Sequence, residues 1–328
     1  MSRLAQLIKL QDYISRYQID MNRYPAQFIR MKKSGWERVK TDWESGELVQ
    51  KWEQIDDSDT VQVEEKKRFS LFKNIFKKNK SMDELDLPIE EKLSDENLDE
   101  DQLPDDETTL RFEPNIVYNP QTIEELKKLF VDQFFHFQLK WASSTLLEKS
   151  FVDSRYLRDS LLRTILQSLP DNYLVLYYPI MKLKKAPIEL DILILTPLEC
   201  LCITVVEREN FAVYIGDSER EHFWLKKVGD TESKVLNPLI QLNRMESIIS
   251  QVFSQNNVTM PIQKVLLSRN GYIDYPGTVY NLQFIDKRDY PEWIQELKRT
   301  ASPMKHMQLQ AAKAILSHVQ TTSYNRIL

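Results

Sequence analysis

The sequence predicts an α/β fold with a mixed sheet, preceded by an N-terminal helical hairpin. Between residues 153 and 268 the pattern runs through a helix, three strands, a further short strand, a second helix and a last strand. This order is typical of helices that pack on a mixed sheet. The first 54 residues instead place apolar side chains at helical spacing, which predicts two amphipathic helices that pack against each other.

The helical hairpin is expected over residues 1–55. Apolar residues follow helical spacing over 2–24, and Pro25 suits the first turn of a second helix that runs to about Gln54. Two helices alone bury little apolar surface. We therefore expect the hairpin to dock on the later domain or on another protomer.

Residues 56–110 have the composition of a disordered charged linker. Residues 66–80 carry seven basic groups and no acid, with Phe and Ile at helical spacing, whereas residues 83–107 hold thirteen acids and one Lys. A basic amphipathic helix over 66–80 would lie on anionic lipid, contact nucleic-acid phosphates or be neutralised by the acidic run beside it. A solvated linker with a few exposed aromatic residues accounts for the same pattern.

The rest of the chain divides into three parts. A long helix that packs on the core is expected within 111–152, after the Asn119–Pro120 turn. An α/β domain follows over 153–300, and a C-terminal helix over 301–328. The strand-like runs of the domain are 173–181, 188–196, 199–207, 211–216 and 264–268. Because only the Pro197 turn separates the second and third of these runs, we expect them to form an antiparallel pair.

Glycine and cysteine usage exclude several classes of protein. The chain has six glycines and none between Gly46 and Gly216, so it lacks the loops of P-loop ATPases and NAD-dependent dehydrogenases. Cys200 and Cys202 project from one face of a strand, which suits two buried thiols rather than a disulfide or a zinc site. The start of the chain has no signal-peptide core and no run of about 18 apolar residues follows, so we expect a cytoplasmic protein.

The order of several motifs resembles a known family. A helix that ends in LQSLPDNYLVL precedes IELDILILTP, an apolar strand, Trp224 and the helix start NPLIQLNRMESII. Over about residues 153–268 this order is similar to the nuclease-related domain (NERD) family, a branch of the restriction-endonuclease-like PD-(D/E)XK fold. The helix start supplies the family-motif residues Asn237, Pro238 and Gln241. The resemblance implies a restriction-endonuclease-like core with a metal-dependent site for phosphodiester cleavage.

The resemblance also implies a set of catalytic residues. In this family an Asp, a Glu-x-Lys pair and an acidic group from the preceding helix hold a divalent cation and activate water. Asp191 matches the Asp position, and Asp159 falls near the helix position. Glu189 shares a strand face with Asp191 and would add a third carboxylate. These three residues are the expected ligands of Mg²⁺ or Mn²⁺ in an active enzyme.

The second strand of the pair departs from the family pattern. The Glu and Lys positions fall on Thr204 and Val206, and Glu199 stands where a glycine usually follows the Thr-Pro turn. A bulge that turned Glu207 inward would still leave no Glu-x-Lys. Thr204 carries no charge for a metal ion and Val206 cannot replace an ammonium group. We therefore expect vestigial catalytic residues on a nuclease fold with little or no nuclease activity.

Three functions stay open at this point. The first is a binding module for nucleic acid, such as DNA, or for a protein partner. Its expected phosphate contacts are Lys182, Lys184, Lys185, Lys226 and Lys227. The second is an active metal-dependent DNA endonuclease that uses Asp159, Glu189 and Asp191. The third is a scaffold or membrane-surface adaptor, in which residues 1–80 hold a protein partner or meet anionic lipid weakly.

Overall fold

The computed structural model describes most of the chain outside the charged linker. The described residues are 4–46, 110, 112–114, 116, 120–145, 147–182, 186–217, 222–299 and 302–322. The chain divides into one unit of residues 1–41 and 110–328 and a second unit of residues 42–109. The predictions for residues 66–80, Lys184 and Lys185 lie outside the described residues. The fold below is that of the first unit.

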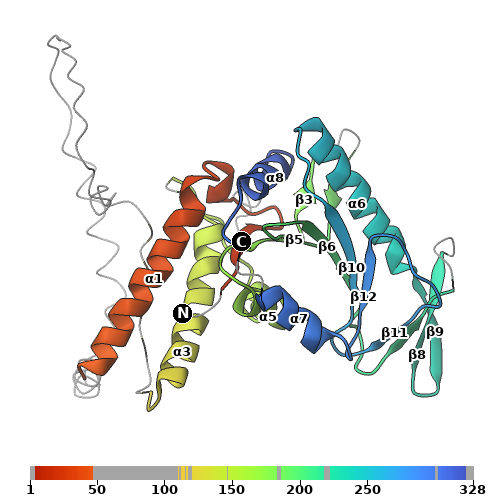
Figure 1. The fold of residues 1–328 in the computed structure, drawn as a ribbon, viewed down its shortest axis with the longest axis horizontal. Coiled ribbons are helices and arrows are strands. Elements are labelled where there is room, and N and C mark those ends of the chain that lie inside the picture. The colour runs from red at the N-terminus through yellow and green to blue at the C-terminus, as the bar shows by residue number, and fades with distance from the viewer. Residues whose placement is uncertain are drawn as a thin grey trace, which may run out of the picture. The chain divides into compact units, whose positions relative to one another are not determined.

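The central sheet has six strands in the order β1-β2-β5-β6-β10-β12 (Figure 1). Their bounds are Gln6–Leu10 (β1), Leu174–Tyr177 (β2), Ile192–Leu195 (β5), Cys200–Val205 (β6), Ile262–Leu267 (β10) and Leu282–Ile285 (β12). β5 is antiparallel to both neighbours, and every other pair is parallel. The carboxyl ends of β1, β2, β6, β10 and β12 therefore lie at one edge with the start of β5. We call this edge the carboxyl edge.

The α/β class and the mixed sheet are confirmed. The predicted antiparallel pair is β5 and β6, in which Ile192 lies opposite Ile203 and Leu195 lies opposite Cys200. Cys200 and Cys202 are buried and free of disulfide bonds, as expected.

The first helix of the predicted N-terminal hairpin is wrong, whereas the second is confirmed over Arg23–Glu44 (α1). Residues expected to form the first helix instead form β1 and a short 3-10 helix, Arg16–Gln18. All five residues of β1 are buried, and β1 pairs in parallel with β2. A short apolar run buried on every side lacks the alternation that separates a strand from a helix. The helical spacing was therefore ambiguous, and pairing with a distant strand decides the structure.

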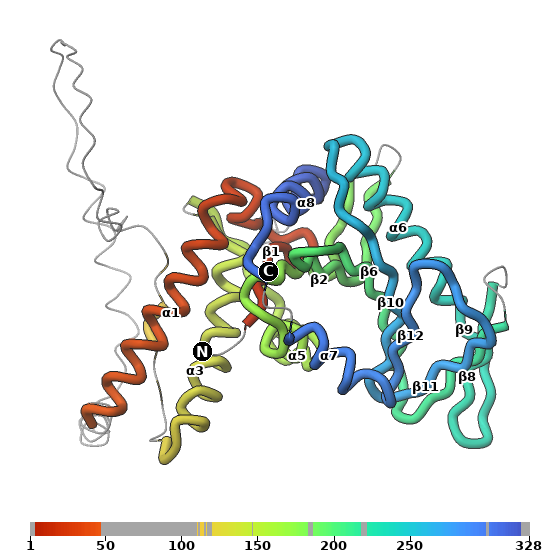
Figure 2. The backbone as a smooth tube through the Cα atoms, in the orientation of Figure 1, coloured from red at the N-terminus to blue at the C-terminus, as the bar shows by residue number. Residues whose placement is uncertain are grey.

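The N-terminal helix that does form packs on the long helix of the third predicted segment. α1 spans Arg23–Glu44 and α3 spans Ile123–Ala142, where Thr122 caps the first turn by accepting a hydrogen bond from Glu125 N. Edge-to-face contacts of Phe28 with Phe134 and of Trp36 with Phe130 join them, at centroid distances of 5.3 and 5.4 Å. α3 also packs on β1, as the backbone trace in Figure 2 shows.

Shorter elements connect and cover the sheet. They are α4 (Ser154–Leu157), α5 (Ser160–Ser168), β3 (Ile180–Met181), β4 (Ile188–Glu189), α6 (Pro238–Gln255), α7 (Tyr290–Arg299) and α8 (His306–Leu316). The helix predicted over 153–168 is broken in two, because Asp159 begins a new helix as its N-cap. α6 packs on β6 and β10, and α8 packs on α6 and β5. Among the described residues no helix is long and apolar enough to cross a membrane.

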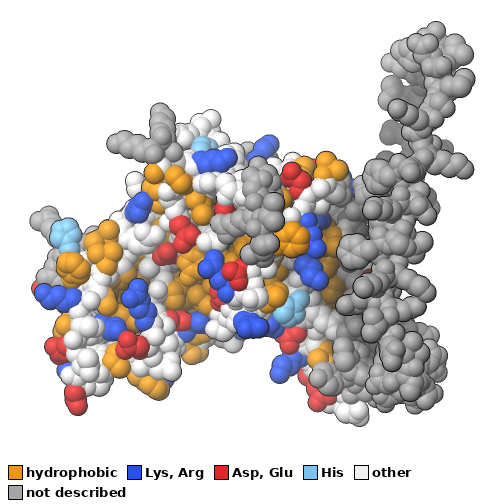
Figure 3. All heavy atoms as spheres, turned by 180° about the vertical axis from the view of Figure 1, so that it is seen from behind, with side chains coloured by type: hydrophobic (Ala, Val, Ile, Leu, Met, Phe, Trp, Pro, Cys, Tyr) orange, Lys and Arg blue, Asp and Glu red, His pale blue; other side chains and the backbone are white. Residues whose placement is uncertain are grey.

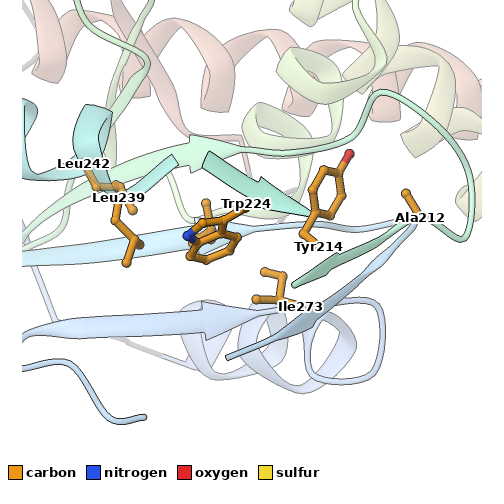
Figure 4. Close-up of a cluster of buried hydrophobic side chains, with 7 residues drawn as sticks. Ala212, Tyr214, Trp224, Leu239, Leu242 and Ile273 are labelled. Carbon is orange, nitrogen blue, oxygen red and sulfur yellow. The ribbon is translucent and has the colours of Figure 1, made fainter. Parts of the chain in front are cut away.

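A second sheet of four strands, in the order β11-β7-β8-β9, packs against the start of α6. Its strands are Tyr272–Asp274 (β11), Val213–Ile215 (β7), Phe223–Val228 (β8) and Thr231–Leu236 (β9). Figure 4 shows the Trp224 ring between Leu239 of α6 and Ile273 of β11. A Cβ at Gly216 would lie 2.3 Å from Trp224 Cε2, so this indole requires a glycine directly after β7.

Candidate functional site

Asp191 lies at the carboxyl edge, immediately before β5. Thr204 on β6 donates its hydroxyl to Asp191 Oδ2 at 2.5 Å, and Gln241 on α6 approaches Oδ1 with its amide nitrogen at 3.5 Å. Burial raises the pKa of Asp191, while these two hydrogen bonds lower it and the charge of Glu189 raises it again. Thr204 at the expected Glu position therefore occupies one oxygen of the carboxylate.

Asp159 has a structural role at the start of α5. Its Oδ1 accepts hydrogen bonds from Leu161 N at 2.9 Å and Leu162 N at 3.0 Å, as an N-cap does. Its Oδ2 accepts the hydroxyl of Tyr177 at 2.8 Å. Both carboxylate oxygens are thus held by donors of the protein itself.

A cleft of about 320 Å³ opens beside these residues. It is lined by Gln11, Arg155, Tyr156, Asp159, Tyr178 and Glu189. The structure therefore brings two of the three predicted carboxylates, Asp159 and Glu189, to one cleft. Asp191 is not in its lining, although its charge, after burial, contributes to the raised pKa of Tyr178.

Arg155 is the cation of the cleft, and sequence reasoning missed it. Its Nη2 donates to Gln11 Oε1 at 3.1 Å and to the Tyr156 hydroxyl at 2.7 Å. The guanidinium carbon lies 4.7 Å from the centroid of the Tyr156 ring. Gln11 Nε2 in turn donates to Glu189 Oε2 at 3.1 Å. No motif singles out this arginine, and its partner Gln11 comes from a segment that was predicted to be helical.

Two residues of the cleft have left-handed backbone conformations. The φ angles are 43° at Gln11 and 50° at Tyr178, directly after β1 and β2. Gln11 N donates to Tyr177 O, and Tyr178 N donates to Asp191 O, each at 2.9 Å. Left-handed conformations cost energy in residues other than glycine and are concentrated at functional sites. They turn the backbone after β1 and after β2, at the points where the side chains of Gln11 and Tyr178 enter the cleft.

The remaining positions of the family pattern are used for packing. Val206, at the expected Lys position, packs against the buried cluster of the second sheet. Glu207 makes a two-oxygen contact with Arg269, whose Nε lies 2.8 and 2.9 Å from its Oε1 and Oε2. Glu199, at the usual glycine, is beside the turn, where Thr196 Oγ1 accepts the Glu199 N–H at 3.0 Å.

Lys182, Lys226 and Lys227, the predicted phosphate contacts that the structure describes, do not line the cleft. Lys182 lines a separate cavity of about 460 Å³ beside α8. Lys226 pairs with Glu209 at 2.7 Å, and Lys227 lies 3.4 Å from Glu232. On the face shown in Figure 3, basic and acidic side chains are interspersed. Surface charge therefore gives no separate indication of a phosphate-binding face there.

The motif at the start of α6 has a clear local purpose. Asn237 Oδ1 caps the helix by accepting a hydrogen bond from Leu239 N at 2.9 Å, and Pro238 occupies the first turn. This cap fixes the helix so that Gln241 faces Asp191.

The donor set does not fit a divalent cation. Mg²⁺ and Mn²⁺ need several oxygens that converge on one point. The oxygens of Asp159 and Asp191 are instead directed at hydrogen-bond donors. Within the part of the chain that the structure describes, no three His, Cys, Asp or Glu side chains are grouped to hold a metal ion.

The mixed sheet and the helices that pack on it form an α/β domain, which is consistent with a nuclease-like core. Residues 155–268 match the family described as "Nuclease-related domain", so the chain contains a domain of that family. A stretch of 42 residues is 50% identical to "RNA 2',3'-cyclic phosphodiesterase" of Geobacillus stearothermophilus, and it spans 13% of each chain. No solved structure matches this protein.

Proposed function

We propose that this protein is a nuclease-related domain of the PD-(D/E)XK kind that binds nucleic acid at the cleft and hydrolyses it poorly or not at all. The observation that carries the proposal is the 2.5 Å hydrogen bond from Thr204 to Asp191. The residue at the position of the metal-binding Glu donates a hydrogen bond to the neighbouring carboxylate instead.

The loss of hydrolysis follows from the chemistry of the reaction. Cleavage of a phosphodiester by this class of enzyme requires a cation to neutralise the phosphate and a base or ammonium to prepare the attacking water. Val206 packs in an apolar cluster at the position of the lysine. Glu207, the nearest acid along the strand, is held by Arg269. Neither residue can supply the missing group.

Binding is supported by Arg155. A guanidinium group presents a planar set of donors that matches phosphate oxygens, and its charge persists at any physiological pH. The Arg155 side chain is 58% exposed, its Nε lies 3.7 Å from Asp153 Oδ2, and Gln11 and Tyr156 orient its Nη2. The carboxylate of Glu189 is held by Gln11, and that of Asp159 by Tyr177 and the start of α5. A phosphate can therefore approach the guanidinium from solvent.

The binding test uses fluorescence anisotropy with short DNA and RNA oligonucleotides at low salt. RNA is included because the relative is named an RNA phosphodiesterase. We expect Arg155→Ala to weaken binding about tenfold and to lower the salt slope by about 1. Arg158→Ala, an exposed arginine after α4, is the matched control and should bind as wild type does. Equal binding by wild type and Arg155→Ala would remove the cleft from the proposal.

An active endonuclease is the second candidate. It is favoured by the shared cleft of Asp159 and Glu189, and by the charge of Glu189, which after burial adds to the raised pKa of Asp191. Plasmid is incubated with Mg²⁺ or Mn²⁺ and either wild type or Asp191→Asn. Equal background cleavage by both would rule out the endonuclease. Metal-dependent cleavage that only the wild type performs would establish an active endonuclease and overturn the proposed loss of hydrolysis.

A further inference from the structure

An exposed aromatic side chain stands at the carboxyl edge, in the loop between β6 and β7. Phe211 is 62% exposed, and its φ angle is 60°. A bulky residue other than glycine is rarely found in the left-handed region, and such conformations are concentrated where function requires them. Neither burial nor backbone preference explains a phenylalanine at this position.

The loop that carries Phe211 is held from behind. Phe211 N donates to Asn270 O at 2.8 Å, and Tyr272 N donates to Ala212 O at 2.8 Å. Ala212, labelled in Figure 4 at the start of β7, is fully buried. A Cβ at Gly271 would lie only 2.5 Å from Ala212 O. The segments that carry Gly271 and Ala212 are therefore as close as a glycine allows. The backbone is thereby fixed, with the Phe211 side chain directed to solvent.

The ammonium group of a lysine contacts the Phe211 ring. The Nζ atom of Lys287, which follows β12, lies 3.9 Å from the ring centroid. This cation–π contact restrains both side chains. The neighbouring cations Arg269 and Arg288 are paired with Glu207 and Asp286. Lys287 has no acidic partner among the ion pairs of the described residues, so its charge is available to a ligand beside an exposed aromatic ring.

We propose that Phe211 and Lys287 form a stacking platform that accepts an unpaired base and its phosphate, so that the nucleic acid bound at the carboxyl edge is single-stranded. This inference rests on the proposed function and specifies its ligand. Aromatic side chains stack on the faces of unpaired bases, whereas a duplex hides those faces in its own stack. A cation beside the ring meets the backbone phosphate.

The platform and the cleft lie on the same edge of the sheet. Tyr178 of the cleft follows β2, whereas Phe211 contacts Asn270 after β10 and Lys287 after β12, three and four strands from β2 in the sheet order. Neighbouring strands are about 4.8 Å apart, which gives a separation of about 15–20 Å along the edge. A single strand of several nucleotides whose phosphate meets Arg155 can therefore place a more distant base on Phe211.

The test measures affinity for four labelled ligands of equal length at low salt: oligothymidylate, oligouridylate, an abasic deoxyribose-phosphate strand and a blunt duplex. We expect wild type to bind both single strands better than the duplex. Phe211→Ala should lose about tenfold for the two base-bearing strands and little for the abasic strand. Phe211→Tyr should bind as wild type does, because it restores the ring. Phe223→Ala removes another exposed phenylalanine, on β8, and is the matched control.

The outcomes separate this inference from the proposed function. If wild type binds and Phe211→Ala binds equally well, the platform is overturned and the cleft stands. If Phe211→Ala loses the abasic strand to the same extent, the residue acts through the fold, which also overturns the platform. Tighter binding of the duplex than of the single strands would also overturn the platform. Failure of wild type to bind any of the four ligands overturns both the platform and nucleic-acid binding.

Discussion

Thr204 donates a 2.5 Å hydrogen bond to Asp191 across the β5–β6 pair, and burial raises the pKa of that carboxyl group above its ordinary 3.8. Between the ordinary and the raised pKa, the folded protein binds more protons than the unfolded chain. The free energy of unfolding therefore falls as the pH rises through this window. The ionised carboxylate is thus a cost to the fold at neutral pH.

Asp191→Asn should consequently be more stable than wild type at neutral pH, and the difference should shrink as the pH falls toward the ordinary pKa of Asp. Urea unfolding at a series of pH values measures it. Thr204→Val should destabilise the wild type by about 1–3 kcal/mol, because it leaves Asp191 with one donor fewer. A less stable Asp191→Asn at neutral pH would show that the ionised form is favoured in the fold.

Lys9 gives a pH dependence of the opposite sign. Its side chain is buried in β1, and this burial lowers the pKa to about 7, against a raising effect of Asp12 and a further lowering by Lys182. Above that value the unfolded chain binds more protons than the folded protein, so the free energy of unfolding rises with pH. We expect a rise of at most about 1.4 kcal/mol per pH unit until the lysine titrates in the unfolded chain.

The matched comparison for Lys9 is Lys9→Met, which keeps the shape of the side chain without the charge. Its stability should lack this component of the pH dependence in the same urea experiments. Parallel curves for the two proteins would mean that the three acceptors around Nζ, which are Tyr13 O, Gln18 Oε1 and Thr321 Oγ1, offset the burial and keep the ammonium group charged in the fold.

Glu207 and Arg269 form a largely buried ion pair at the ends of β6 and β10. Their side chains are 11% and 20% exposed, and Arg269 also donates its backbone N–H to Glu207 Oε1 at 2.7 Å. Arg269→Met should cost about 3 kcal/mol of stability, since it leaves a poorly solvated carboxylate without its partner. In the Glu207→Gln background the same change should cost less. A double-mutant cycle with a coupling energy near zero would contradict the pairing.

Gly216 and Gly277 give a steric comparison. An alanine Cβ at Gly216 would overlap the Trp224 ring, whereas at Gly277 the nearest atom, Tyr275 Cε1, is 3.5 Å away. We expect Gly216→Ala to lower the free energy of unfolding by about 1–3 kcal/mol through overpacking. Gly277→Ala should be close to neutral or raise it by about 0.5 kcal/mol. Thermal unfolding compares the two, and equal effects would show that the indole can move aside.

Local signals account for the parts of the fold that could be predicted. The Thr196-Pro197 turn and the Asn237-Pro238 start determine β5, β6 and α6 within a few residues of their own sequence. β1 could not be assigned in this way, because its partner β2 lies more than 150 residues further along the chain and supplies the hydrogen bonds that make it a strand. The same limit applies to the cleft. The nearness of Asp159 and Glu189 follows from neighbouring elements, whereas the Arg155–Gln11 contact spans 144 residues.

The β1 strand also has a consequence for the order in which the chain folds. Besides its pairing with β2, the β1 segment forms hydrogen bonds with residues near the end of the unit. Lys9 Nζ donates to Thr321 Oγ1 at 3.0 Å, and Thr322 N donates to Asp12 O at 3.0 Å. During synthesis β1 leaves the ribosome well before these partners, which lie 312 and 310 residues further along the sequence. Pairing over such separations is slow to form. We expect β1 to be a late addition to an already formed sheet, and a nascent chain that stops before Thr321 to present an uncovered edge to chaperones.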